Sequence, residues 1–157
     1  MYKYYLWAHA RKHYVRGKHK FEGCIFCGIA EDNPEVPKRV VHRARDFILI
    51  MNIFPYSPGH LEIIPKRHIE DIAELNNEEY NTLWRYVKYT LSVLKGTLKP
   101  DGVNIGINLG GDISGASILH LHIHIVPRYI EGRHVEQDIE KIHKMFLKYV
   151  EEHDFHE

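Results

Sequence analysis

The sequence HLHIHIV at residues 120–126 carries the strongest structural signal in the chain. Histidines and apolar side chains alternate there, and residue 119 extends the pattern, which is typical of a β-strand with one buried face. On such a strand His120, His122 and His124 share one face, with successive imidazoles roughly 7 Å apart. We expect Pro127 to end the strand. A solvated sheet face, a row of metal ligands and a catalytic site all fit this spacing, so spacing alone does not separate them.

Segments rich in β-branched and aromatic residues, bounded by turn residues, predict four more strands. They are residues 39–42, 47–52, 60–64 and 103–109. Apolar residues at helical spacing predict a long helix over residues 77–98 and another over residues 135–151, with a weaker pattern at residues 4–14. Strand neighbours joined by short turns, interrupted by one long helix, predict an antiparallel sheet with helices on one side. The expected class is α+β.

The overall composition sets limits on the partners of this chain. Its 157 residues fit one compact domain. Lys plus Arg and Asp plus Glu both number 21, so no global field favours nucleic acid or an anionic membrane surface. The start of the chain lacks a signal-peptide pattern, and no apolar run is long enough to span a membrane. We therefore expect a cytoplasmic protein with neither nucleic-acid nor membrane partners.

Two further motifs stand upstream of the histidine strand. They are NIFPYSPGHLEIIPKRH at residues 52–68 and NLGGDISGAS at residues 108–117. Together with HLHIHIV, and in this order, they resemble the histidine-triad (HIT) superfamily over residues 23–129. The sequence PRY at residues 127–129 and the Asn-Leu-Gly loop most resemble the branch of fragile-histidine-triad hydrolases and diadenosine tetraphosphate phosphorylases. The resemblance implies a HIT-like antiparallel sheet of about five strands with one long helix and a C-terminal helix.

The same resemblance implies a domain organisation and an assembly. We expect residues 1–157 to form a single HIT domain with a short N-terminal extension, residues 1–22. The family commonly forms two-fold dimers that extend the sheet across protomers, and an uncapped antiparallel edge would favour such a homodimer here.

The resemblance also assigns chemistry to three histidines. By the family pattern, His122 attacks the α-phosphorus of a nucleotide and forms a nucleotidyl-imidazole intermediate, which divides one difficult displacement into two easier steps. His124, on the same face, would donate to a phosphate oxygen as charge develops. His60, in the upstream motif, resembles a second donor on the phosphate side.

Substrate contacts are expected from two asparagines and the glycine-bearing loop. Asn52 occupies the family position that contacts the ribose, and Asn108 matches a polar loop residue near the phosphates, although either could simply satisfy turn backbone groups. The loop from residue 110 to residue 117 offers accessible backbone amides, including that of Gly115, and Ser117 could add a hydroxyl. Such a loop can equally be a plain hairpin connection.

Cys24 and Cys27 form a Cys-x-x-Cys pair, which in a reducing compartment favours metal binding or redox chemistry over a disulfide. Two thiolates supply half of a tetrahedral zinc site. In relatives that keep this pair, zinc is completed by the histidines that correspond to His68 and His120, so the resemblance implies a closed structural zinc site and no organic cofactor. A metal-free reduced dithiol is the alternative. Redox chemistry and a catalytic zinc are disfavoured, since neither a βαβ setting nor a His-Glu-x-x-His motif is present.

Several other side chains are assigned to ordinary structural positions. Aromatic and apolar residues of the strands could wall an adenine pocket or belong to the core, Trp84 and Leu91 are expected in the core, and a set of acidic residues is expected on solvated faces. The possible pocket residues are Phe26, Phe47, Ile48 and Leu49, and the acidic set is Glu62, Glu70, Asp71 and Glu74.

The sequence thus predicts a nucleotidyl hydrolase or transferase that acts on dinucleoside polyphosphates such as diadenosine tetraphosphate. Water or inorganic phosphate would accept the nucleotidyl group. The alternatives are a purine-nucleotide-binding or sensing HIT protein, a nucleoside phosphoramidase with slow turnover, and a structural zinc-binding protein that takes no nucleotide.

Overall fold

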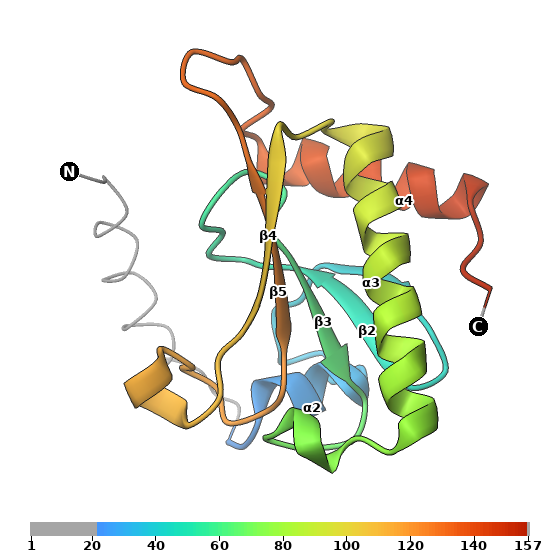
Figure 1. Ribbon diagram of the computed structural model, residues 1–157, viewed down its shortest axis with the longest axis vertical. Helices are drawn as coiled ribbons and strands as arrows, with labels where there is room; N and C mark the ends of the chain where they lie inside the picture. Colours follow the sequence, from blue (N-terminus) through green and yellow to red (C-terminus); the bar gives the residue numbers. More distant parts are fainter. Residues whose placement is uncertain (1–21, 157) are drawn as a thin grey trace.

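The computed structural model describes residues 22–156, so the expected helix at residues 4–14 and almost all of the expected N-terminal extension lie outside the described part. Five strands form one antiparallel sheet in the order β1-β2-β3-β5-β4 (Figure 1). Their bounds are β1 (Val40–Arg43), β2 (Phe47–Met51), β3 (Leu61–Pro65), β4 (Gly102–Ile107) and β5 (Ile123–Arg128). The helices are α2 (Ile25–Ala30), α3 (Asn77–Thr97) and α4 (Ile139–Glu152), with 3₁₀ turns η1 (Ile72–Glu74) and η2 (Gly111–Ser114). The predicted α+β class is confirmed.

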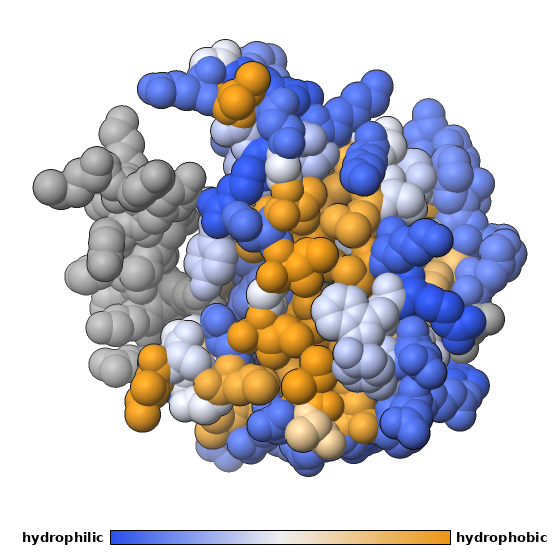
Figure 2. Space-filling model, in the orientation of Figure 1, coloured by the Kyte–Doolittle hydropathy of each residue, from blue (hydrophilic) through white to orange (hydrophobic). Residues whose placement is uncertain are grey.

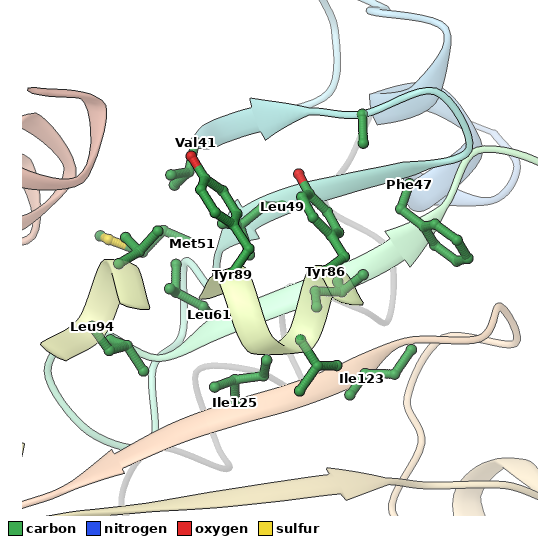
Figure 3. Close-up of a cluster of buried hydrophobic side chains, with 14 of the residues drawn as sticks. Val41, Phe47, Leu49, Met51, Leu61, Tyr86, Tyr89, Leu94, Ile123 and Ile125 are labelled. Carbon is green, nitrogen blue, oxygen red and sulfur yellow. The ribbon is translucent and has the colours of Figure 1, made fainter. Parts of the chain in front are cut away.

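The main core lies between the sheet and helices α3 and α4. Apolar side chains from the strands point toward rings on α3, as the close-up in Figure 3 shows for Leu49, Leu61 and Tyr86. Phe146 of α4 is also fully buried in this cluster. Burial of this apolar surface is the main stabilising contribution to the fold.

The long helix α3 begins at a reciprocal capping box. The Asn76 side chain accepts from the backbone N–H of Glu79 at 2.9 Å, and the Glu79 carboxylate accepts from the backbone N–H of Asn76. The buried stripe of α3 includes Leu83 and Tyr86. The prediction that Trp84 belongs to the core is wrong, because Trp84 is 40% exposed. Trp84 follows Leu83 by one residue, or about 100° around the helix, and so lies at the edge of the stripe.

A second, smaller core lies on the opposite face of the sheet. There Phe26 and Ile29 of α2 pack against Ile48, Ile50 and Ile64 of the sheet. The expectation that helices cover only one side therefore holds for α3 and α4 but not for α2, a helix too short to show an apolar period in the sequence.

Strand β5 differs from the prediction at both ends. It begins at Ile123, because the segment before it leaves the ladder: the backbone N–H of Leu121 donates to the carbonyl of Ile69 at 2.6 Å. Pro127 does not end the strand but pairs with Val103 of β4. The pairing of β5 with β3 stops at Ile125, so Pro127 needs a partner on one side only, where proline is tolerated.

No helix within residues 22–156 combines the length and the apolar character needed to cross a membrane.

Candidate active site and metal cluster

The site lies on the face of the sheet that carries α2. Strand register places Ile50, Glu62 and His124 side by side across β2, β3 and β5, and Gly106 of β4 completes the row. Directly opposed residues on one sheet face have Cβ atoms about 5 Å apart, so Glu62 and His124 must interact. Among residues 22–156, no atom lies within 4 Å of a Cβ built at Gly106, so no described side chain fills the space beside it.

His122 is held in one ring orientation. Its Nδ1 lies 2.8 Å from the carbonyl oxygen of His120, and since a carbonyl can only accept, Nδ1 carries the proton. In the neutral ring the lone pair is then on Nε2. The edge of the Phe26 ring packs on the imidazole at 5.2 Å between centroids, and only 3% of His122 is exposed. The arrangement presents one nucleophilic nitrogen.

His60, Glu62 and His124 form a buried polar group beside His122. The Oε1 atom of Glu62 lies 3.1 Å from Nδ1 of His124, which lies 3.0 Å from Nε2 of His60. Asn52 donates from Nδ2 to the same Glu62 oxygen at 2.7 Å. The expectation that Glu62 is a solvated surface charge is therefore wrong: it is 5% exposed, because its position in β3 faces inward beneath α2.

The charge state of Glu62 follows from its neighbours. Burial alone would raise its pKa, but the hydrogen bond from His124 and the positive charges of His60 and His124 lower the pKa to about 2. An ionised carboxylate can only accept, and Asn52 Nδ2 donates to it, while His124 Nδ1 lies beside it and shares a hydrogen bond with His60 Nε2. The Nε2 atom of His124 is buried and has no hydrogen-bond partner among residues 22–156. A buried polar atom of this kind is costly unless a ligand satisfies it.

A cavity opens between α2 and the sheet, next to His122. Its walls are mostly apolar and its polar lining includes Asn52, Glu62, Ser117 and His122. The apolar walls come from Ile25, Phe26, Ile29, Pro37, Ile50, Met51, Ile53, Phe54 and Ile118, and Lys38 and Arg39 also line the cavity. Of the side chains considered for an adenine pocket, Phe26 lines this cavity, whereas Phe47, Ile48 and Leu49 belong to the two cores.

Only two of the four predicted substrate residues line the cavity. Ser117 and Asn52 line the cavity, but the Asn52 carboxamide is already engaged, since its Oδ1 accepts from the backbone N–H of Phe54 at 2.6 Å. Asn108 and Gly115 are close to each other and do not line the cavity. Gly115 has a φ of +86°, so it ends the η2 turn in a conformation that favours glycine.

The second cluster consists of Cys24, Cys27, His68 and His120, whose ligand atoms all lie within 4.8 Å of one another. Sγ of Cys24 lies 3.3 Å from Nδ1 of His120, and Sγ of Cys27 lies 3.3 Å from Nδ1 of His68. Tetrahedral zinc, with Zn–S near 2.3 Å and Zn–N near 2.0 Å, places its ligand atoms about 3.5 Å apart. The donor set and its spacing fit zinc.

The protonation of His120 suits a metal ligand. Its Nε2 lies 2.9 Å from the carbonyl of Pro65, which fixes the proton on Nε2 and leaves the Nδ1 lone pair facing the cysteines. The pKa of His120 is lowered to about 4, mainly by burial. The charges of His68 and His122 also lower this pKa, and the hydrogen bond to Pro65 raises it in part. Burial and the neighbouring Cys24 raise the pKa of Cys27 to about 11, so without a metal this thiol keeps its proton at neutral pH.

Comparison with known proteins agrees with this geometry. The HIT domain matches residues 33–131 of the chain. The chain belongs to the HIT family. A crystal structure of a Zn-bound histidine triad family protein from Mycobacterium smegmatis superposes with a TM-score of 0.72 at 25% identity, covering 84% of this chain and 96% of that one.

Two sequence relatives of this HIT protein illustrate the range of its similarity. An AP-4-A phosphorylase of Mycobacterium tuberculosis is 36% identical over 90 residues, which are 57% of this chain and 46% of the phosphorylase. This HIT protein thus matches about half the length of that relative. An uncharacterised HIT-like protein of Methanocaldococcus jannaschii is 39% identical over 106 residues, 68% of this chain and 79% of the relative.

Sequence reasoning missed Glu62 as a residue of the site. A signal was present: the residue is the one charge in the stretch LEIIP of β3, whose five residues are all buried. A charge within such a strand must either face solvent or have a buried partner. The identity of the partner, His124, came only from the strand register.

Proposed function

We propose that this HIT protein cleaves dinucleoside polyphosphates, of which diadenosine tetraphosphate is the type, by transferring a nucleotidyl group to His122. The observation that carries the proposal is the fixed His122 ring beside an apolar cavity, with Nδ1 donating to the His120 carbonyl at 2.8 Å. The apolar walls suit a purine base, and the similarity to an AP-4-A phosphorylase supports the substrate class.

In the first step the lone pair of His122 Nε2 forms a bond to the α-phosphorus. The bond from phosphorus to the bridging oxygen breaks, and its electron pair leaves with the departing polyphosphate. His122 needs no separate base, because its Nδ1 proton stays on the hydrogen bond to the His120 carbonyl. In the second step an acceptor oxygen displaces the imidazole and the lone pair returns to Nε2.

His124 and His60 act on the oxygens of the phosphoryl group. The Nε2 of His124, which has no hydrogen-bond partner in the described part of the chain, is placed to donate to an oxygen on which charge develops, with its ring centroid 4.7 Å from that of His122. His60, the residue before β3, supports this ring, and Ser117 offers a hydroxyl from the cavity lining. Asn52, Asn108 and Gly115 are the other proposed substrate residues. Asn52 contributes as part of the cavity lining.

We propose further that Cys24, Cys27, His68 and His120 hold one structural zinc ion. When bound, the ion supplies a crosslink between the α2 segment, the residues after β3 and the segment that leads into β5. Four protein ligands leave no open coordination position, so the site supplies no Lewis-acid chemistry to the substrate.

The test uses the purified protein with diadenosine tetraphosphate and chromatographic detection of products. We expect turnover by the wild type, loss of at least a thousandfold in His122→Ala, and no change in His134→Ala, a histidine on an exposed segment outside the cavity. Radiolabelled inorganic phosphate identifies the acceptor: label in a nucleoside diphosphate indicates phosphorolysis, and unlabelled nucleoside monophosphate indicates hydrolysis. Equal turnover in the wild type and His122→Ala would contradict the proposal.

A further inference from the structure

Strand order places a polar, exposed strip of β4 on the side of β5 that is away from the apolar cavity. The strands follow one another as β2, β3, β5 and β4 (Figure 1), and the cavity, which is lined by Ile50 of β2, lies on the β2 side of His124. Asn104 and Gly106 of β4 are exposed and pair with Val126 and His124, so they lie on the same face as the site. A substrate that extends from the cavity past His124 therefore crosses β4.

Gly106 is a glycine that its backbone conformation does not require. It lies inside β4, and its φ is not in the positive range that favours glycine. Glycine weakens the interior of a strand, where it often marks the close approach of a ligand or of another chain segment. Within residues 22–156 nothing lies within 4 Å of a Cβ built there, so no described segment makes that approach. A ligand of the site can therefore pass over β4 at this position.

Arg128 supplies a cation beside this strip. It is the arginine of the PRY motif at residues 127–129, and it follows His124 by four residues on the same face of β5. Its Nε donates to Oδ1 of Asn104 at 2.6 Å, which directs the guanidinium toward β4. The two Nη atoms carry further N–H donors, and among residues 22–156 these donate to no side chain or carbonyl and pair with no carboxylate. Arg128 is exposed, so an anion can reach these donors.

We propose that Arg128, positioned by Asn104, binds the polyphosphate of the leaving group as it passes over Gly106. This inference rests on the proposed nucleotidyl transfer to His122 and assigns a place to the part of the substrate that departs. The ligand class is a chain of two or more phosphates, because phosphate oxygens accept from the fork of a guanidinium and their charge is attracted by the cation. The transferred nucleoside occupies the apolar cavity, over β2 and β3, and the departing half lies over β4. No bond to Arg128 forms or breaks in the reaction.

The experiment compares two substrates that transfer the same adenylyl group and differ in what departs. Diadenosine tetraphosphate releases adenosine triphosphate, whereas adenosine 5′-phosphorofluoridate releases fluoride and has no polyphosphate. For Arg128→Gln we expect kcat/KM on the tetraphosphate to fall by about 10- to 100-fold, the loss expected for hydrogen bonds to a charged group, and kcat/KM on the fluoridate to stay at the wild-type value. Arg128→Lys keeps the charge without the fork and should lie between Arg128→Gln and the wild type on the tetraphosphate.

Two further variants test the path of the leaving group. Gly106→Val fills the gap with a residue that strands favour, so we expect the same selective loss on the tetraphosphate with an unchanged or higher thermal midpoint. Asn104→Ala releases the Arg128 side chain and should produce a smaller selective loss, about 3- to 10-fold. The control is Arg85→Gln, which removes the same charge from an exposed position of α3, on the other face of the sheet, and should match the wild type on both substrates.

Equal losses on both substrates in Arg128→Gln, or no loss on either, would overturn the subsite. Dissociation of a wild-type dimer in Arg128→Gln, measured by sedimentation, would also overturn it, because Arg128 would then be an interface residue. In all of these cases the proposed function stands as long as the wild type cleaves the fluoridate and His122→Ala does not. If the wild type and His122→Ala cleave the fluoridate equally, nucleotidyl transfer to His122 fails and the subsite falls with it.

Discussion

The backbone carbonyl of His120 accepts the Nδ1 proton of His122 at 2.8 Å, while the side chain of the same His120 places its Nδ1 3.3 Å from Sγ of Cys24. One residue thus takes part in both clusters of the site, with its backbone in one and its ring in the other. Any movement of the metal cluster therefore moves the group that orients the proposed nucleophile.

Removal of zinc should weaken both the fold and the reaction. Because a metal ligated from separate segments stabilises the native state, we expect Cys24→Ser to lower the thermal midpoint by about 10 °C. We also expect kcat to fall by about tenfold at a temperature where the variant is folded, since His122 loses its fixed orientation. Elemental analysis should give one zinc per chain in the wild type. A zinc-free protein with an unchanged midpoint and full activity would contradict this prediction.

Stability should depend on pH through Glu62. Its pKa of about 2 in the folded protein lies below the ordinary value of 4.5, so the ionised group contributes stability that is fully present above pH 4.5. That contribution is lost as the pH falls from 4.5 toward 2. Urea unfolding at pH 6 and pH 3.5 should therefore show a larger loss for the wild type than for Glu62→Leu. Parallel losses in the two proteins would show that Glu62 does not titrate in this way.

The exposed edge strand predicts a homodimer. Strand β4 pairs only with β5 in the described sheet, and Ile105 on β4 is 41% exposed. Apolar side chains gather between β4 and α3 on the face shown in Figure 2. A second copy of the chain would cover this edge. Sedimentation should show a dimer for the wild type and a monomer for Ile105→Lys, whereas Met145→Lys, at an exposed residue of α4, should stay dimeric. A monomeric wild type would refute the prediction.

The sequence was sufficient for most of the fold because its elements have strong local signals. The long helix was predicted at residues 77–98 and found at Asn77–Thr97, with the Asn76 capping box to mark its start. Strand existence was also predictable from composition and turns. The ends of β5 were not, since the contact of Leu121 with Ile69 and the one-sided pairing of Pro127 are tertiary features.

The candidate site was predictable to a similar degree. The residues of the metal cluster and the three histidines proposed as catalytic follow from motifs, and the structure brings Cys24, Cys27, His68 and His120 together as predicted. Glu62 was misassigned because both faces of β3 are buried. The short helix α2 covers the second face, and period-two alternation in the sequence does not reveal that cover. The roles of these residues in catalysis stay predictions.

The most direct test of the account is to trap the covalent intermediate. The protein is mixed briefly with a slowly turned-over analogue of diadenosine tetraphosphate, quenched under basic conditions that preserve phosphorus–nitrogen bonds, and digested for mass spectrometry. We expect one added adenylyl group, located on His122 and absent from His122→Ala. An adenylyl group on another residue, or product formation with no modified histidine at any time point, would contradict nucleotidyl transfer to His122.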